Sequence, residues 1–534
     1  MIVKNLHRWF ILEGWHTWPG GVAWGLVVLM GLLLLWLPLS TAVAIVVGLG
    51  LLFLIIIQPL SGLALALLAG PFGALEQIVF NVSALDSGQL LLLLTFAAWI
   101  ARGLARRRIN LPPNYLTLPF AIMIGVSLLS LPGAASIELG LRELLKWIEM
   151  LIIVWLVVDL GFTGLVEAEG NINKSSVGGP PRALWIILML LLAGISQALI
   201  GIWQFGFRAD GPEHFLVLER FYRAYGTFEQ PNPFGGFMNL SALLAIGILI
   251  GLLAAWLHYL WAGHMEGRNQ RNKPGADRRS SLTAGRALPT FLLFLFVAFA
   301  AAVTSLALLL SWSRGAWLGF AAGLAAIIFF LPRKRFYGAL LVGIGITLFL
   351  ILLTGERLPP ALSNRITSFA QDFRLGDVRG VDINDDNYAV LERQAHWQAG
   401  LEMLNKNMLL GVGFGNYAAA YPDYALLNWP DPLGHAHNYY INLLAEMGVL
   451  GLIAYLLFWS AVLWQTIRAL GALEWPGRGV VLGLMGVWIA LAAHQLVDKL
   501  FVNNIYIYLG VLLGLLQLMD LQKSRNPVIE NKRL

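Results

Sequence analysis

The chain has 534 residues, of which 58% are hydrophobic and 12% charged, with a formal net charge of +6 and no cysteine. This composition excludes an ordinary soluble domain, and the lack of cysteine excludes disulfides, thiolate-bound metals and thiol nucleophiles. In so apolar a chain a positive net charge is typical of the cytoplasmic loops of a membrane protein, so no nucleic-acid partner is predicted.

Apolar runs of about 20 residues, long enough to cross a hydrocarbon core of about 30 Å, recur along the chain. They are apolar on every face, which favours helices over the alternating strands of a membrane barrel. We therefore predict an all-α integral membrane protein, a polytopic bundle of 12 to 14 transmembrane helices. The expected spans are residues 22–38, 41–57, 60–80, 88–105, 115–132, 139–160, 183–206, 234–262, 288–311, 315–331, 337–354, 438–464, 478–498 and 503–521. In the third, Gly70, Pro71 and Gly73 predict a broken or re-entrant element.

Lys and Arg collect after the fourth, eighth and tenth spans, and again in the C-terminal tail, all on one side when the spans alternate. Positive loops mark the cytoplasmic side, so both termini are expected in the cytoplasm of a bacterial cell, with the protein in its cytoplasmic (inner) membrane. The division that follows is an N-terminal transmembrane bundle (1–354), a large outer loop domain with surface helices (355–437), C-terminal transmembrane helices (438–521) and a cytoplasmic tail (522–534).

The segment 219–233, ERFYRAYGTFEQPNP, lies before the eighth span on the predicted outer face and carries Arg220 and Arg223 where positive charge is not favoured. Such arginines either reach toward lipid headgroups or bind a phosphate or pyrophosphate bidentately. Arg314, in the short link SWSRGA between the ninth and tenth spans, is expected at the same boundary. A second positive charge there favours the anion site.

The sequence HAHNYY opens the twelfth span and offers His435 and His437. Three interpretations stay open for the pair: a metal site, which has a weak signature without Cys or HExxH; hydrogen-bonded structural histidines; and a general base for an incoming hydroxyl. The upstream run GVGFGN lacks the strand and the Lys-Ser/Thr of a phosphate loop and is predicted to be a turn. His494, Asp498 and Lys499 are further ionisable candidates near the thirteenth span.

Three pieces occur in order: RAYGTF with Pro231-Asn232, then SRGA at 313–316, then HNYY at 437–440 followed by LLAEMGVLG. Together they resemble the O-antigen ligase/O-antigen polymerase superfamily, which includes protein O-oligosaccharyltransferases. The resemblance implies a GT-C-type fold and glycan transfer without a nucleotide sugar or another cofactor. It implies that Arg223 and Arg314 bind a diphosphate and that His437 is the activating base. Arg220, His435, Asn438 and Asn232 are the expected neighbouring substrate-binding residues, and no metal ligand is assigned.

The partners implied by the resemblance are an undecaprenyl-diphosphate-linked glycan donor, a hydroxyl acceptor on a glycan, a lipid or a protein, and membrane lipid. A ligase, a polymerase and a protein-glycosylating enzyme all remain open. Two other classes are a multi-span transporter, for example of small anions, and a non-catalytic assembly factor. A transporter should carry ionisable groups at the bilayer midplane and often has two related halves, whereas here the charged candidates gather at the outer boundary.

Overall fold

The computed structural model describes residue 31 and residues 36–80, 85–107, 111–112, 114–169, 182–208, 210–270, 281–372, 376–384 and 387–524. Its elements are α3 (Leu39–Ile57), α4 (Pro59–Ala69), η1 (Gly70–Phe72), α5 (Gly73–Phe80), α6 (Ser87–Ala105), α7 (Thr117–Ser130), η2 (Leu131–Gly133), α8 (Ile137–Glu169), α9 (Arg182–Gly206), η3 (Glu213–Phe215), β1 (Leu216–Val217), β2 (Phe221–Tyr222), α10 (Pro231–Gln270), α11 (Ser281–Leu310), α12 (Arg314–Phe330), α13 (Arg335–Thr354), α14 (Pro360–Asp372), α15 (Tyr388–Lys406), α16 (Tyr417–Ala420), η4 (Tyr421–Asp423), α17 (Tyr439–Ala472), α18 (Gly477–His494) and α19 (Ile505–Ser524). The predicted first span, 22–38, and the predicted tail, 522–534, lie almost entirely outside the described residues.

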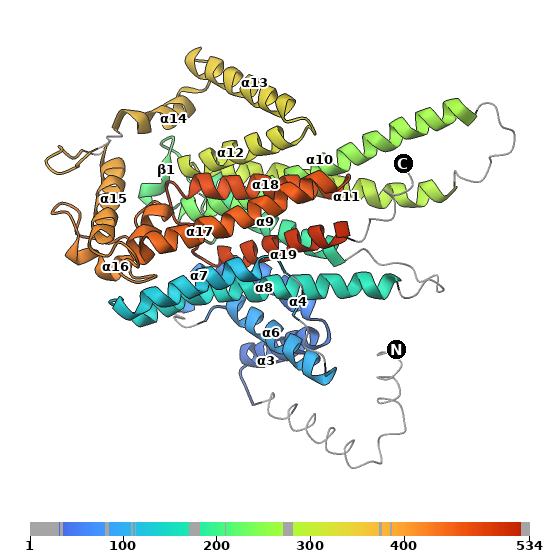
Figure 1. Ribbon diagram of the computed structural model, residues 1–534, viewed down its shortest axis with the longest axis horizontal. Coiled ribbons are helices and arrows are strands. Elements are labelled where there is room, and N and C mark those ends of the chain that lie inside the picture. Colours follow the sequence, from blue (N-terminus) through green and yellow to red (C-terminus); the bar gives the residue numbers. More distant parts are fainter. Residues whose placement is uncertain are drawn as a thin grey trace.

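The chain is an all-α polytopic membrane protein, as predicted (Figure 1). Within the described residues, nine helices are long and apolar enough to cross a membrane, and three shorter apolar helices are Thr117–Gly133, Arg314–Phe330 and Ile505–Leu521. The long helix α8 carries several charged residues and belongs to neither set.

The predicted break in the third span is present, because α4 ends at Ala69, η1 follows and α5 starts at Gly73. Backbone carbonyls freed by a break inside a membrane need new donors. The Asn504 side-chain amide donates to the Gly70 carbonyl at 3.1 Å, and the Thr227 hydroxyl donates to the Pro71 carbonyl at 2.5 Å. The broken element is thereby attached to the segment that carries Arg223.

Helix α18 is the most buried of the nine candidate spans, and Figure 1 shows it among α10, α12 and α17. It approaches α10 at glycines on both helices, since a Cβ on Gly247 would collide with the Gly483 backbone and one on Gly479 with Gly251. Without a hydrophobic driving force in lipid, such close backbone approach supplies the packing. Helix α18 ends at His494.

The predicted outer domain contains α14, α15, α16 and η4, with a second apolar core that includes Leu391, Met403 and Tyr421. In Figure 1, α15 lies across the end of the helix bundle. The two longer helices of this region are α14 and α15.

A glycine-rich turn follows α15 and is hydrogen-bonded to α17. Helix α17 is interrupted at Gly448, whose φ is +64° and whose missing side chain leaves room for the Leu409 carbonyl. Val412 and Gly413 donate their backbone N–H groups to the carbonyls of Ala445 and Glu446, both at 2.9 Å. The GVGFGN run is therefore a turn, as predicted, and it fixes the outer helix against the span that begins beside His437.

One local feature departs from the all-helical expectation. Leu216 pairs with Tyr222 and Val217 with Phe221 in a short antiparallel hairpin. Positive φ values at Leu218 and Glu219 give the mirror-image turn that suits the twist of a hairpin. The hairpin has too few residues to show strand alternation in the sequence.

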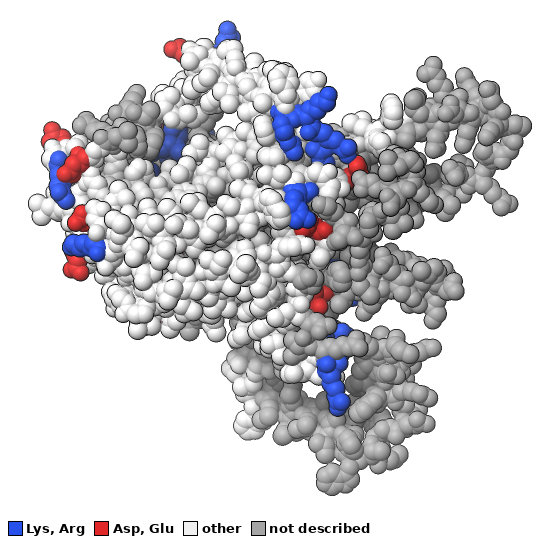
Figure 2. Space-filling view, viewed as in Figure 1, with Lys and Arg blue, Asp and Glu red and all other residues white. Residues whose placement is uncertain are grey.

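Basic side chains gather at the end of the bundle opposite α15 and α16, as Figure 2 shows. There Arg335 and Arg478 donate to carbonyls at the C-terminus of α12, among them that of Phe330 at 3.2 and 3.1 Å. Cations at a helix C-terminus satisfy its free carbonyls and interact favourably with its dipole. The acidic and basic side chains at the α15 end are mixed.

Candidate functional site

Arg223 is held in place from both its backbone and its side chain. Its backbone N–H donates to the Phe215 carbonyl at 2.9 Å, its Nε donates to the Ser311 carbonyl at 2.9 Å, and its Nη2 lies 3.4 Å from Asn232 Oδ1. Burial, together with repulsion from Arg365, Arg393 and Arg314, lowers the pKa of Arg223 to about 9. A fixed, partly desolvated guanidinium is suited to binding an anion.

Arg314 is the first residue of α12, immediately after the cap residue Ser313. The Ser313 hydroxyl accepts from the Ala316 N–H at 3.4 Å and donates to Asn232 Oδ1 at 2.8 Å. Asn232 therefore connects the Arg223 segment to the start of α12. The positive end of the α12 dipole adds to the charge of the arginines.

Two arginines of the outer domain, Arg365 in α14 and Arg393 in α15, complete the cluster and were missed by the sequence analysis. Arg365 Nη2 donates to the Trp312 carbonyl at 3.2 Å, and burial, with repulsion from Arg314 and Arg393, lowers the pKa of Arg365 to about 10. The Nε atoms of both are buried without a hydrogen-bond partner among the described residues. Arg365 and Arg393 could have been predicted by the reasoning used for Arg223, because they are positive charges in a segment that the sequence predicts to face outward.

Arg223, Arg314, Arg365 and Arg393 are called here the arginine cluster. Each of the other three lowers the pKa of Arg223, and Arg314 and Arg393 also lower that of Arg365. Figure 2 shows Lys or Arg atoms deep in a recess beside α14. Like charges that are partly buried together create a strongly positive site, and a diphosphate is an anion that can neutralise several guanidinium groups at once.

Three histidines form a second group, the histidine cluster. The ring centroids of His435 and His437 lie 4.4 Å apart, and those of His396 and His437 lie 5.6 Å apart. His396 comes from α15, and its Nδ1 lies 3.1 Å from the Tyr417 hydroxyl. The outer domain and the loop before α17 therefore build this group together.

His437 has the properties of a proton acceptor. Both of its ring nitrogens are buried, and neither has a hydrogen-bond partner in the described part of the chain. Burial lowers the pKa of His437 to about 3, and repulsion from His435 also lowers it. The ring is therefore neutral at pH 7, with a free nitrogen that can accept the proton of an incoming hydroxyl.

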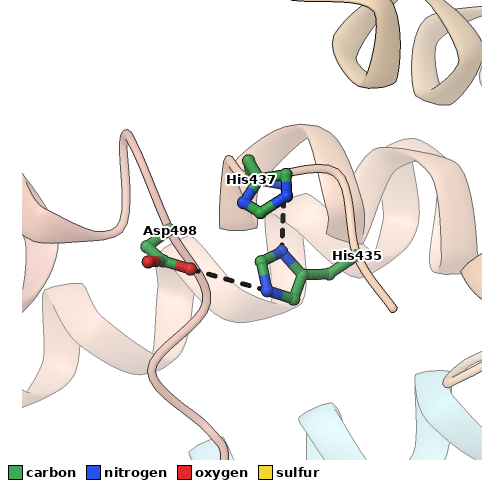
Figure 3. A group of neighbouring side chains, drawn as sticks. All are labelled: His435, His437 and Asp498. Carbon is green, nitrogen blue, oxygen red and sulfur yellow. Dashed lines mark hydrogen bonds and ion pairs between the residues drawn. The ribbon is translucent and has the colours of Figure 1, made fainter. Parts of the chain in front are cut away.

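His435, His437 and Asp498 are the described residues whose grouping could hold a metal ion, since their ligand atoms lie within 4.8 Å of one another (Figure 3). The His437 backbone N–H donates to His435 Nδ1 at 3.0 Å, so that nitrogen is already used. His435 Nε2 lies 3.5 Å from Asp498 Oδ1. A metal would have to compete with this contact.

Arg393 links the two clusters. Its charge lowers the pKa of Arg223 and Arg365 and also that of His435 and His437. Among the four arginines, Arg393 is therefore the one whose charge acts on both clusters.

The remaining predicted residues lie in varied places. Arg220 is exposed, with its guanidinium 5.3 Å from the Phe221 ring, so the structure does not bring it into the arginine cluster. Asn438 is the cap residue of α17 and accepts from the Tyr440 and Ile441 N–H groups at 3.0 and 3.1 Å.

Of the further ionisable candidates, His494 is fully buried and packs against Gly315. A Cβ added to Gly315 would lie 2.9 Å from His494 Nε2. Lys499 Nζ is paired with Glu143 at 3.0 Å.

Residues 299–456 match the family described as O-antigen ligase. The matched stretch runs from α11 into α17 and contains Arg314, Arg365, Arg393 and His437, while Arg223 precedes it. No curated protein matches the chain at a significant level.

Proposed function

We propose that this member of the O-antigen ligase/polymerase superfamily, which carries the family's domain at residues 299–456, is a membrane glycosyltransferase. It transfers a glycan from an undecaprenyl-diphosphate carrier to an acceptor hydroxyl on the outer face of the bacterial cytoplasmic membrane. The observation that carries the proposal is the arginine cluster together with His437, whose buried ring nitrogens have no partner among the described residues and whose pKa Arg393 also lowers.

The arginines bind the leaving group. In the transfer, the bond between the anomeric carbon and the carrier's phosphate oxygen breaks, and negative charge develops on the diphosphate. Fixed guanidinium groups stabilise that charge more in the transition state than in the ground state, which is the interaction that accelerates a reaction. Arg223 and Arg314 are the ligands already indicated by the sequence, and Arg365 and Arg393 add two more.

His437 activates the acceptor. Its free ring nitrogen takes the proton of the acceptor hydroxyl while the oxygen forms the new bond to the anomeric carbon. The electron pair of the broken bond leaves with the carrier diphosphate, and the proton on His437 is released when the product departs. The acceptor is the hydroxyl of a glycan, a lipid or a protein.

The charge distribution supports an outward-facing site. Lys and Arg gather at the opposite end of the bundle (Figure 2), and positively charged loops face the cytoplasm. The same distribution argues against an anion transporter, because the arginine cluster lies at one end of the bundle rather than at its midpoint.

The test is glycan transfer in membranes supplied with an undecaprenyl-diphosphate oligosaccharide, with His437→Ala and Arg314→Ala compared with wild type at equal abundance. The matched control is Arg379→Ala, which removes an exposed arginine of the outer domain that pairs with Asp377. We expect both site variants to lose at least a hundredfold in rate and the control to keep full activity. A wild type that transfers to none of the three acceptor classes, or site variants that match the control, would refute the proposal.

A further inference from the structure

His437 has a backbone conformation that its side chain does not favour. Its φ is +50°, in the left-handed region where residues with a Cβ are uncommon. Such a conformation persists only when surrounding interactions impose it, and it is found most often at functional sites. An interaction that holds the His437 backbone therefore also decides where its ring lies.

The His435 side chain supplies that interaction. Its Nδ1 accepts the His437 backbone N–H at 3.0 Å, a contact from residue i+2 back to the side chain of residue i. A side-chain acceptor used in this way replaces a backbone turn bond and stabilises a tight turn. Figure 3 shows the His435 ring between the His437 loop and Asp498.

Because a backbone N–H can only donate, His435 Nδ1 must be unprotonated, and the proton of the neutral ring is on Nε2. That nitrogen lies 3.5 Å from Asp498 Oδ1. Asp498 is itself held, since its Oδ1 also accepts the Lys499 backbone N–H at 2.8 Å, and Lys499 is paired with Glu143. A carboxylate beside one imidazole nitrogen fixes the tautomer that leaves the other free to accept.

We propose that Asp498 and His435 are positioning residues: Asp498 holds His435 in the Nε2–H tautomer, and His435 Nδ1 holds the His437 loop so that the His437 ring faces the acceptor hydroxyl. This rests on the proposed function, in which His437 is the base. His435 itself touches neither the sugar nor the diphosphate in this scheme. The pair acts on the rate of the chemical step and leaves binding of the donor unchanged.

Two conservative substitutions test the roles of the two His435 ring nitrogens, Nδ1 and Nε2, one at a time. His435→Asn keeps an acceptor near the Nδ1 position and removes the contact with Asp498, whereas His435→Gln keeps a donor near the Nε2 position and removes the acceptor for the loop. We expect kcat to fall about tenfold in His435→Asn and about a hundredfold in His435→Gln, with the KM for the lipid-linked donor unchanged. Equal loss in the two variants, or a loss confined to KM, would overturn the proposal.

Asp498→Asn tests the other half through a double-mutant cycle. Alone, it should lower kcat about tenfold; added to His435→Ala, it should lower kcat no further, because Asp498 acts only through His435. An additional tenfold loss in the double variant would show that Asp498 acts independently and would overturn the assignment. Membrane abundance and thermal unfolding in detergent identify variants that fail to fold. If one of the other variants does not fold, the rate of His435→Asn is compared with that of wild type instead.

The outcomes for the pair and for the proposed function are distinguishable. If wild type transfers glycan and His437→Ala does not, the proposed function holds whatever the His435 variants do. If a chelator abolishes wild-type transfer and added divalent metal restores it, His435 and Asp498 are metal ligands, and the positioning role is wrong.

Discussion

Two groups of charged side chains differ in the charges that surround them. In the first, Glu143 lies between two cations, 2.7 Å from Lys146 Nζ and 3.0 Å from Lys499 Nζ. In the second, the arginine cluster, the strongest influences on the pKa of Arg223 are burial and three other arginines. Because burying like charges is costly, a cluster of this kind is expected where an anion arrives as a ligand. The ion-paired group around Glu143 supports structure, and the proposed function assigns the arginine cluster to an anionic ligand.

The largest effect on stability should come from removing the carboxylate of Glu143, which is paired with Lys146 and Lys499. Glu143→Gln leaves the buried Lys499 and the half-buried Lys146 without this carboxylate, and removing one partner of a buried ion pair costs about 3–5 kcal/mol of stability. Thermal unfolding of the purified protein measures this. The matched control is Glu138→Gln in the same helix, whose pair with Arg142 is exposed and should cost about 1 kcal/mol or less. Equal destabilisation by the two variants would contradict the expected difference between the Glu143 and Glu138 ion pairs.

Removing a charge from the arginine cluster should affect stability in the opposite way. Arg365→Ala removes a charge that the other arginines repel, so thermal stability should stay the same or rise, while transfer should fall about a hundredfold, or about 2.7 kcal/mol of transition-state stabilisation. Arg220→Ala is the control, because Arg220 is exposed on the Phe221 ring and should change the rate less than about threefold. A less stable Arg365→Ala with normal transfer would mean that the cluster is structural.

The smallest effect concerns pH. The pKa of His437 is lowered to about 3 by burial, so the neutral, proton-accepting form persists as the pH falls below 6.5. Transfer should therefore be nearly as fast at pH 5 as at pH 7, whereas a base with a pKa near 6.5 would lose roughly thirtyfold. The free energy of unfolding should depend on pH in the same direction. Between pH 6.5 and about 3 the His437 side chain is protonated in the unfolded chain but not in the folded one, so its contribution to stability is lost as the pH falls through this range. A rate that halves near pH 6.5 would contradict this expectation.

Much of the fold and part of the site could be predicted from the sequence. The apolar runs predicted an all-helical membrane bundle, and Gly70, Pro71 and Gly73 predicted the broken third span, because these properties depend on local composition and backbone geometry. Arg223 and Arg314 could be singled out because each stands in a short segment next to a predicted span. The two-residue strands of the hairpin were missed because they carry no periodic signal.

What the sequence by itself determined about this protein is which residues enter the membrane and which few polar residues stand at its boundary, since transfer of a side chain into hydrocarbon depends mainly on that side chain. The tertiary structure alone decided that Arg365 and Arg393, from a region predicted only as an outer domain, join Arg223 and Arg314, and that His435 holds the His437 loop. These contacts depend on how the glycine turn fixes α15 against the break in α17. Such long-range packing brings together residues whose separation along the chain gives no sign that they meet.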